Sequence, residues 1–409
     1  MNCVLIDTAS SGHHVTFMAG FAEAILACGC NPHVVFPVPD AVKEQMRCNG
    51  DDTDKVTFHT CDEEDFSQPV HGVALRARWL KRWRGAARKL QIIERELGAP
   101  VDRVFFAWMD PFLLDLPTSL LINGLFRHRF SGLLFAPFDI LHNRARRRPG
   151  LKWITSRGHV LRLNRCLSIC TLDETLDDQL ARTFRRKTVV LPDVLDSTLP
   201  PEPDVKRVQA EILRQSKGRL VLAVLGSLEA RKGVIDVLRL IERGTMPHIF
   251  LLMAGEIQWH SFSEPDSHFL REIMKRALPG CCLRFGGLLK EAELNALLIS
   301  SDVLYLCYRA FRQSSALLAK AAYFRIPVLA FDENLIGWRV RRHSLGWTVS
   351  QGERDAFLRG LDRRTLDGFR AARRFLDGSS AYQKEQDRGL LPGRLAEALA
   401  LRPRAAVAS

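Results

Sequence analysis

Residues Val221–Leu240 read VLAVLGSLEARKGVIDVLRL, and this stretch decides the fold. Its apolar run ends at Gly226 and is typical of a buried strand of a parallel sheet. A short polar loop follows and ends in Arg231 and Lys232, and after Gly233 the apolar residues take up helical spacing. The stretch therefore predicts one strand–loop–helix unit of an α/β sheet.

The same unit predicts an anion site. The start of a helix directs free backbone N–H groups and a partial positive charge toward one point. Arg231 and Lys232 add two cations beside that point, which suits a phosphate or a diphosphate. An ordinary strand–helix connection with a solvated Arg–Lys pair explains the local sequence equally well.

The alternation of short apolar runs with helical patterns extends over most of the chain. At 409 residues the chain suits two domains. Strands are expected at 4–6, 33–36, 103–108, 132–135, 167–170 and 188–191, and again at 220–225, 249–253, 283–285, 303–306 and 328–331. The proline-rich segment Asp193–Asp204 separates the two series. We expect domains at 1–195 and 196–353, and a helical segment at 354–409 that packs back on the first domain.

The composition indicates the kind of partner. The chain is 46% hydrophobic and 26% charged, which is typical of a globular protein, and its net charge of +13 favours anionic partners. Nucleotide phosphates, an anionic membrane surface and nucleic acid all fit that charge. Because no nucleic-acid recognition motif is present and the charge is dispersed, we expect no nucleic-acid partner.

The cysteines and the apolar segments indicate the compartment. The ten cysteines include no CxxC pair with a matching histidine set, so we expect reduced thiols and no metal. The N-terminus lacks a basic leader, and no stretch approaches the ~20 apolar residues of a membrane span. We expect a cytoplasmic protein, with the inner face of a membrane as a second location.

The basic segment Arg76–Lys89 suggests that second location. Its arginines and lysines surround Trp79 and Trp83, which are four residues apart and share one helical face. Basic residues with interfacial tryptophans suit an anionic membrane surface. The alternative is a solvated helix whose tryptophans pack on the domain.

Several polar residues follow the expected strands of the first half. Gly12 lets a ligand approach the backbone closely, and His13 and His14 stand next to it. Asp110 and Asp139 follow two further strands, at the sheet edge where open α/β sheets bind ligands. Solvated loop residues are the alternative explanation for both histidines.

A series of short motifs in this chain resembles the motif series of a known protein family. The motifs are Gly226-Ser227-Leu228, Arg231-Lys232-Gly233, Leu251–Glu256, Phe285–Leu288 with Glu291 and Leu294, Ser301–Leu304, Pro327–Ala330 and Leu345-Gly346, with looser matches at Ser11–His14 and Leu191–Asp193. This series is similar to the retaining nucleotide-sugar glycosyltransferases of family 4. The resemblance implies the GT-B fold, an α/β architecture of two facing Rossmann-like domains with parallel sheets and a deep cleft between them.

The resemblance also implies a function and a set of residues. It implies metal-independent transfer of a sugar from a nucleotide diphosphate donor to a saccharide or lipid-linked acceptor, in cell-surface polysaccharide synthesis, with no cofactor beyond the donor. Arg231 and Lys232 would hold the donor diphosphate and act in catalysis. The other expected donor-binding residues are Gly226, Gly255, Glu256, Ser314, Ser315 and Lys320. The expected acceptor-side residues are Gly12, His13, His14, Asp110 and Asp139.

Two departures from the family pattern stand out. The family carries two glutamates eight residues apart near the donor, and this chain has Arg312 and Lys320 there. A lysine can only donate hydrogen bonds, so we expect Lys320 to contact a negative group or a hydroxyl lone pair of the donor, unless it is a solvated helix residue. Phe138-Asp139 stands where relatives have His-Asp. These departures favour, as an alternative, an inactive GT-B-like protein that binds an anionic ligand or partner.

Overall fold

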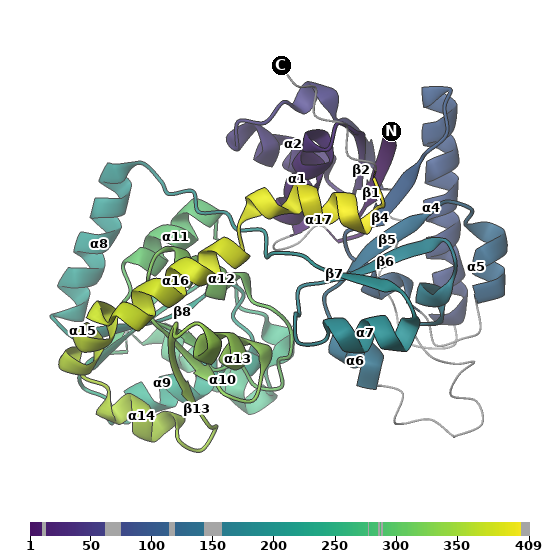
Figure 1. The fold of residues 1–409 in the computed structure, drawn as a ribbon. Coiled ribbons are helices and arrows are strands. Elements are labelled where there is room, and N and C mark those ends of the chain that lie inside the picture. Colours follow the sequence, from purple (N-terminus) through teal and green to yellow (C-terminus); the bar gives the residue numbers. More distant parts are fainter. Residues whose placement is uncertain are drawn as a thin grey trace. The chain divides into compact units, whose positions relative to one another are not determined.

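The computed structural model describes residues 1–9, 14–61, 75–113, 119–142, 158–276, 278–284, 287 and 289–401, with the side chains of 75–80 and 119–121 left out. The chain forms two compact units. The first is Met1–Val194 together with the segment that begins at Asp387, and the second is Leu195–Gln386. Each unit is a parallel sheet with helices packed on it (Figure 1), which confirms the predicted α/β fold with two Rossmann-like domains.

The first unit contains, in its described part, a seven-stranded parallel sheet of order β3-β2-β1-β4-β5-β6-β7. The strands are β1 (Asn2–Ile6), β2 (Asn31–Phe36), β3 (Thr57–Thr60), β4 (Arg103–Phe106), β5 (Phe130–Leu134), β6 (Cys166–Thr171) and β7 (Lys187–Val190). The helices are α1 (His14–Ala27), α2 (Pro39–Cys48), α4 (Leu75–Leu97), α5 (Ser119–Leu125), α6 (Pro137–His142), α7 (Asp177–Phe184) and α17 (Leu391–Ala398). Strand β3 was not predicted, because two of its four residues are exposed, two are half-buried, and they carry almost no apolar periodicity.

The second unit contains, among its described residues, a six-stranded parallel sheet of order β10-β9-β8-β11-β12-β13. The strands are β8 (Leu220–Leu225), β9 (Ile249–Ala254), β10 (Cys281–Arg284), β11 (Val303–Leu306), β12 (Val328–Phe331) and β13 (Gly346–Val349). The helices are α8 (Glu202–Ser216), α9 (Val234–Glu242), α10 (Glu264–Lys275), α11 (Glu291–Ile299), α12 (Ala316–Tyr323), α13 (Leu335–Arg342), α14 (Arg354–Gly360), α15 (Arg363–Ala371) and α16 (Arg373–Glu385).

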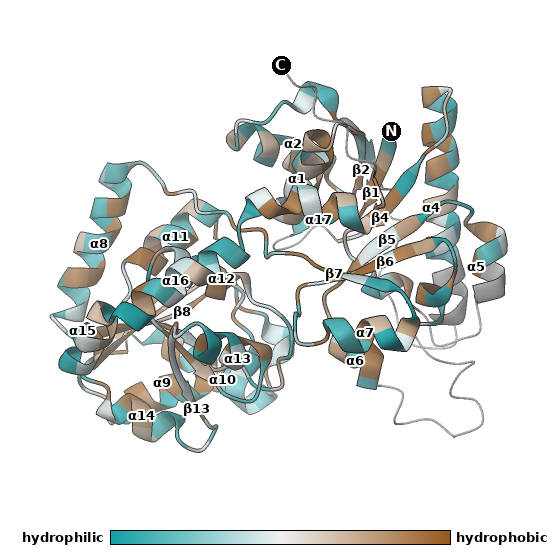
Figure 2. Cartoon of the chain, in the orientation of Figure 1, coloured by the Kyte–Doolittle hydropathy of each residue, from teal (hydrophilic) through white to brown (hydrophobic). Residues whose placement is uncertain are grey.

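The stretch Val221–Leu240 lies at the middle of the second sheet. All six residues of β8 are buried, the 3-10 turn Ala230–Lys232 follows, and α9 begins at Val234. In the hydropathy colouring of Figure 2 the sheet of this unit is largely brown, as expected for strands covered on both faces. The strand–loop–helix unit predicted from this stretch is therefore present.

The C-terminal segment is divided between the two units. Helices α14, α15 and α16 belong to the second unit. Helix α17 belongs to the first, where Leu391 and Leu395 lie in the same apolar cluster as Phe17 and Phe21 of α1. Figure 1 shows α17 in yellow beside α1 in purple, so the last described helix completes the core of the first domain.

Trp83 of α4 is a core residue. It is fully buried against the rings of Phe106, Phe112, Phe126 and Phe130, and its indole N–H donates to the carbonyl of Phe112 over 3.1 Å. A ring enclosed in this way cannot insert into a membrane surface. The membrane interpretation of Trp83 is therefore wrong, and the side chain of Trp79 lies outside the described residues. No helix among the described residues has both the length and the apolar character needed to span a bilayer.

We predict that one buried histidine makes the first domain sensitive to acid. His33 of β2 is 2% exposed, and neither ring nitrogen has a hydrogen-bond partner among the described residues. Burial, with a smaller contribution from His59, lowers the pKa of His33 to about 4. His33 binds its proton more tightly in the unfolded chain than in the folded one. The free energy of unfolding therefore falls by about 3 kcal/mol, through this histidine alone, as the pH drops from about 6.5 to 4.

Denaturant unfolding between pH 7 and pH 4 measures this loss. His33→Leu is expected to reduce the acid loss, and His268→Leu, at an exposed histidine of the second domain, is the control. An acid loss in His33→Leu as large as that of the natural protein would contradict the assignment.

Candidate functional site

The order of strands in the second sheet marks a place for a ligand. All six strands are parallel, but β9 and β10 follow on one side of β8 while β11, β12 and β13 follow on its other side, so the strand order reverses between β8 and β11. Ligands of open α/β sheets bind outside the carboxyl ends of the strands at such a point. Gly226 follows β8 directly, and Arg231 and Lys232 lie in the same loop. Gly255 and Glu256 follow β9, and Ser314 and Ser315 lie in the segment between β11 and α12.

Direct contacts join the two loops at this point. The backbone N–H of Arg309, after β11, donates to the carbonyl of Arg231, after β8, over 2.7 Å. The guanidinium of Arg231 lies 4.3 Å from the centre of the Phe311 ring, and the ammonium of Lys232 lies 5.4 Å from that of Tyr308. The structure thus brings Arg231 and Lys232 together with the segment that leads into α12.

Lys232 is a buried cation. It is 6% exposed, and its ammonium donates to the carbonyl of Leu225 over 2.9 Å. No carboxylate among the described residues forms an ion pair with it. Burial, and then the charge of Arg231, lower the pKa of Lys232 to about 7. A buried ammonium without a counter-ion is unfavourable, so an anion bound beside it would stabilise its charged form.

Arg231 is only partly neutralised. Its Nε and Nη2 donate to the two carboxylate oxygens of Glu229 over 2.5 and 3.1 Å. Burial opposes ionisation of Glu229, but the hydrogen bond and the charge of Arg231 lower the pKa of that carboxyl below its ordinary value. The Nη1 of Arg231 is buried and has no hydrogen-bond partner among the described residues. This guanidinium therefore still has donors for a ligand.

Two glycines allow the loops after β8 and β9 to approach each other. Gly226 has φ +79° and Gly255 has φ +137°. A Cβ atom on Gly255 would lie 2.1 Å from the carbonyl oxygen of Gly226. Glu256 is exposed, and its backbone carbonyl accepts from Leu228 over 2.7 Å, which continues the pairing beyond the strands.

The two serines before α12 have different surroundings. Ser315 is the N-cap residue of α12, but its side chain makes no capping hydrogen bond. The hydroxyl of Ser314 accepts a hydrogen bond from the buried guanidinium of Arg339. The serine side chains therefore do not cap the helix. Their contact with a donor stays a prediction.

Lys320 is held within the second domain. It is 4% exposed, and its ammonium contacts the carboxylate of Glu291 over 2.7 Å, the side-chain oxygen of Asn295 over 2.9 Å and the backbone carbonyl of Asp196. The ammonium thus donates hydrogen bonds to Asn295 and to the Asp196 carbonyl, and its charge is paired with Glu291. The residue is thus not the solvated lysine of the alternative account, and its contact with a donor stays a prediction.

The first sheet has a similar edge. Its strand order reverses between β1 and β4, and Asp7 follows β1. One carboxylate oxygen of Asp7 lies 2.8 Å from Nδ1 of His14, and the other accepts from the backbone N–H of Ala9 over 3.0 Å. The His14 ring lies 5.0 Å from the ring of Trp108. Gly12 and His13 lie outside the described residues.

Sequence reasoning missed Asp7. A carboxylate directly after a buried strand was the available signal, and it was used for Asp110 and Asp139 alone. In the structure Asp110 accepts from the backbone N–H groups of Phe135 and Ala136 over 2.9 and 3.0 Å, and burial raises its pKa to about 6. Asp110 therefore holds the loop after β5, while Asp139 is exposed on α6. No His, Cys, Asp or Glu cluster that could hold a metal occurs among the described residues.

Comparison with known proteins identifies the fold. The chain matches no model of a known protein family, and no curated protein matches it. Among solved structures it is similar to HepE from Anabaena in complex with UDP and glucose, with a TM-score of 0.65, 13% identity, and coverage of 98% of this chain and 99% of that one.

Two further structures show the same likeness. Sucrose-phosphate synthase from Thermosynechococcus elongatus has a TM-score of 0.66, 12% identity and 97% coverage of both chains. WaaG, a glycosyltransferase involved in lipopolysaccharide biosynthesis, has a TM-score of 0.59, 16% identity, and coverage of 98% of this chain and 100% of that one. At such low identity the likeness shows the fold alone, which is the GT-B arrangement of two Rossmann-like domains.

The close approach of Gly226 and Gly255 leads to a prediction. Gly255→Ala places a methyl group against the Gly226 carbonyl at a backbone angle that other residues rarely adopt. We expect the variant to lose about 3 kcal/mol of unfolding free energy. Gly244→Ala is the matched control, because φ is +66° there and nothing lies within 4 Å of the added atom. We expect the control to lose about 1 kcal/mol. Equal losses in denaturant unfolding would show that the approach is not tight.

Proposed function

We propose that the protein is a glycosyltransferase that takes a sugar from a nucleotide diphosphate donor. The observation that carries this proposal is Lys232, a buried ammonium without a carboxylate partner among the described residues, beside Arg231 at the carboxyl edge of the second sheet. That edge is where this fold class binds nucleotides. HepE, which shares the fold, was solved with UDP and glucose and with UDP-glucose, and this supports the same class of donor.

The proposed chemistry rests on charge. When the bond between sugar and diphosphate breaks, negative charge develops on the leaving nucleoside diphosphate. Cations fixed in a site of low dielectric stabilise that charge without reorganising, so they lower the barrier. Arg231 offers an unpartnered Nη1 and Lys232 offers an ammonium that an anion would keep protonated. Gly226 and Gly255 would let the diphosphate approach the backbone of the two loops.

Further parts of the proposal concern the rest of the reaction. We propose transfer with retention, without a metal, to a saccharide or lipid-linked acceptor in cell-surface polysaccharide synthesis. On the acceptor side we propose Gly12, His13 and His14, with Asp7 as the residue that orients His14. Asp110 would shape the acceptor loop, and Asp139 would be available to a ligand. Location on an anionic membrane face would rest on the exposed Lys81, Arg84 and Arg88 of α4.

One observation favours a second candidate function, a binding protein without transfer activity. Lys320 stands at a family glutamate position, and its ammonium is occupied by acceptors of its own domain. A screen of nucleotide sugars for release of nucleoside diphosphate separates the two functions. Release supports the transferase, whereas tight binding without release supports the second candidate.

One prediction of the proposed function concerns Arg231 and Lys232. Arg231→Gln and Lys232→Met are each expected to lower transfer by about a hundredfold, equivalent to ~3 kcal/mol, and to weaken binding of UDP measured by calorimetry. Arg243→Gln is the control, since Arg243 is an exposed residue just after α9. If both variants bind UDP as tightly as the control, the loop is an ordinary connection and the proposal fails.

Another prediction of the proposed function concerns the proton on Lys232. Its pKa is about 7 without ligand, and a bound diphosphate raises it. Binding at pH 8 should therefore take up about one proton per site, and affinity should fall as the pH rises above 7. Calorimetry in two buffers of different ionisation enthalpy measures this uptake. Lys232→Met should abolish it, and an unchanged uptake in that variant would assign the proton to another group.

A further inference from the structure

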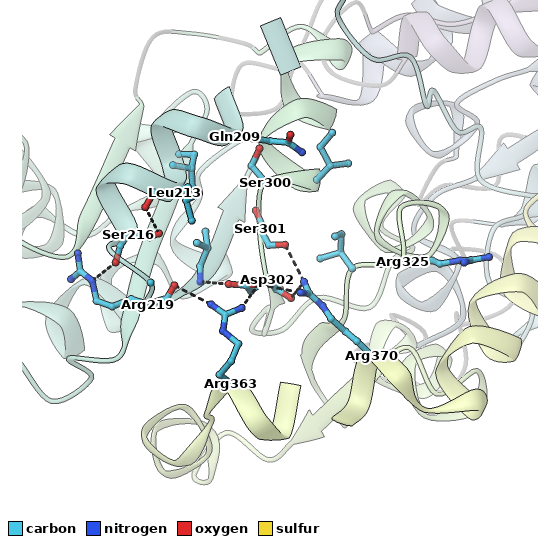
Figure 3. Close-up of a pocket in the computed structure, with 15 residues that line it drawn as sticks. Gln209, Leu213, Ser216, Arg219, Ser300, Ser301, Asp302, Arg325, Arg363 and Arg370 are labelled. Atoms are coloured by element: carbon cyan, nitrogen blue, oxygen red, sulfur yellow. Dashed lines mark hydrogen bonds and ion pairs between the residues drawn. The ribbon is translucent and has the colours of Figure 1, made fainter. Parts of the chain in front are cut away.

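A second basic cavity lies in the same domain. It has a volume of about 570 Å³ and is drawn in Figure 3. Its walls come from the ends of α8 and α11, the starts of β8 and β11, the turn before β12, and α15. Its described charged residues are Arg219, Arg325, Arg363, Arg370 and Asp302. A cavity of this size is typical of small-molecule sites, and its lining carries a clear excess of positive charge.

This cavity is separate from the candidate donor site. Val221 and Asp302 stand at the amino ends of β8 and β11, whereas the donor residues follow the carboxyl ends of the same strands. The six residues of β8 span about 20 Å at roughly 3.3 Å per residue. A small ligand in the cavity therefore cannot reach Arg231 or Lys232.

The carboxylate of Asp302 accepts hydrogen bonds from two arginines that line the cavity. Oδ1 of Asp302 accepts from Arg363 over 2.8 Å and from Arg370 over 3.2 Å, and Oδ2 accepts from the backbone N–H of Val221 over 3.0 Å. Figure 3 shows both arginine side chains pointing toward Asp302. A single negative charge shared by two guanidinium groups leaves positive charge uncompensated at this point.

Hydrogen bonds to backbone carbonyls explain two of the arginines. Arg219 donates to the carbonyls of Ser216 and Gln215 over 2.9 and 3.2 Å, at the end of α8. Arg370 donates to the carbonyls of Asp302 and Ser301 over 2.8 and 3.3 Å. Basic side chains near a helix end often bind its last carbonyls, as Arg219 does on α8. The carbonyls that Arg370 binds lie beyond the end of α11, just before β11. These two residues therefore have a structural role that needs no ligand.

Arg363 is not explained in this way. Its side chain is 45% exposed, and besides Asp302 it contacts only the carbonyl of Arg219, at 3.4 Å, among the described residues. A guanidinium has five N–H donors, so several of its donors remain for a ligand. Arg325 is exposed and, in Figure 3, extends away from Asp302, which places its charge outside the cluster on the floor.

Part of the remaining wall is apolar. Ile212, Leu213, Ile299 and Ile326 line it, and Leu213 is 70% exposed, the most exposed of the large apolar side chains that the structure describes. We propose that this cavity binds an organic phosphate, with the phosphate on Arg363, beside the positive charge of Arg370, and the carbon part along the apolar wall. Guanidinium groups match phosphate because their planar forks donate two parallel hydrogen bonds.

Titration of the full-length protein with a hexose 6-phosphate tests the site. Arg363→Gln is expected to weaken binding at least tenfold. Arg364→Gln is the matched control, because Arg364 is exposed on the same helix and does not line the cavity. Binding must also survive in Lys232→Met, which places it outside the donor site. Equal affinity of Arg363→Gln and Arg364→Gln, or loss of binding in Lys232→Met, would overturn the proposal.

Asp302→Asn provides a second variant. The amide keeps an acceptor for Val221 but removes the charge shared by the two arginines, so phosphate affinity should rise. If the arginines only hold the fold, this variant loses thermal stability without a gain in affinity, which would count against the site.

An organic phosphate in this cavity could be a soluble metabolite or the head group of a lipid, and two binding experiments distinguish them. Binding of the hexose 6-phosphate would identify the natural ligand as a soluble phosphorylated metabolite. The protein could instead fail to bind the sugar phosphate but sediment with vesicles of phosphatidic acid and phosphatidylcholine in a way that depends on Arg363. That result would identify the ligand as a lipid head group. Binding of neither probe at millimolar concentration would refute the proposal.

Discussion

The hydrogen bond from the Lys232 ammonium to the carbonyl of Leu225 links the fold to its candidate chemistry. It holds a charge at the carboxyl end of the central strand β8, in a place where solvent hardly reaches. Parallel strands bring all their carboxyl ends to one edge, and the reversal between β8 and β11 opens that edge to a ligand. The buried sheet thus supports a cation whose charge is unfavourable until an anion arrives.

The fold was largely predictable because most strands are continuous apolar runs. A strand such as β8 is buried on both faces, so its residues are nearly all apolar, and the following loop and helix keep their own pattern. Strand β3, with residues Thr57–Thr60, lies at the sheet edge and is only half buried, so the same signal is absent. The position of α17 depends on contacts with α1, more than 360 residues away in sequence, which no local pattern encodes.

The candidate site was predictable only in part, because one residue type can serve opposite roles. Lys232 and Lys320 are both lysines in apolar surroundings and both are buried. The first has a carbonyl as its hydrogen-bond acceptor, whereas the second contacts Glu291, Asn295 and a backbone carbonyl. Their sequence contexts gave no basis for this difference, since it depends on side chains brought in by α11. Asp7 and His14 likewise form a pair that only the folded sheet edge reveals.

The same reasoning explains why a net charge of +13 could not locate a binding site. Some cations of the second domain are already bound to carbonyls, as Arg219 is at the end of α8 and Arg370 is just before β11. What distinguishes a potential site is a cation whose donors exceed its acceptors in a place that a ligand can reach. Lys232 with Arg231 meets that condition at the carboxyl edge of the sheet, and Arg363 meets it at the amino edge. The two ends of β8 therefore carry separate positive sites, and their separation by a rigid buried strand lets each be tested without disturbing the other.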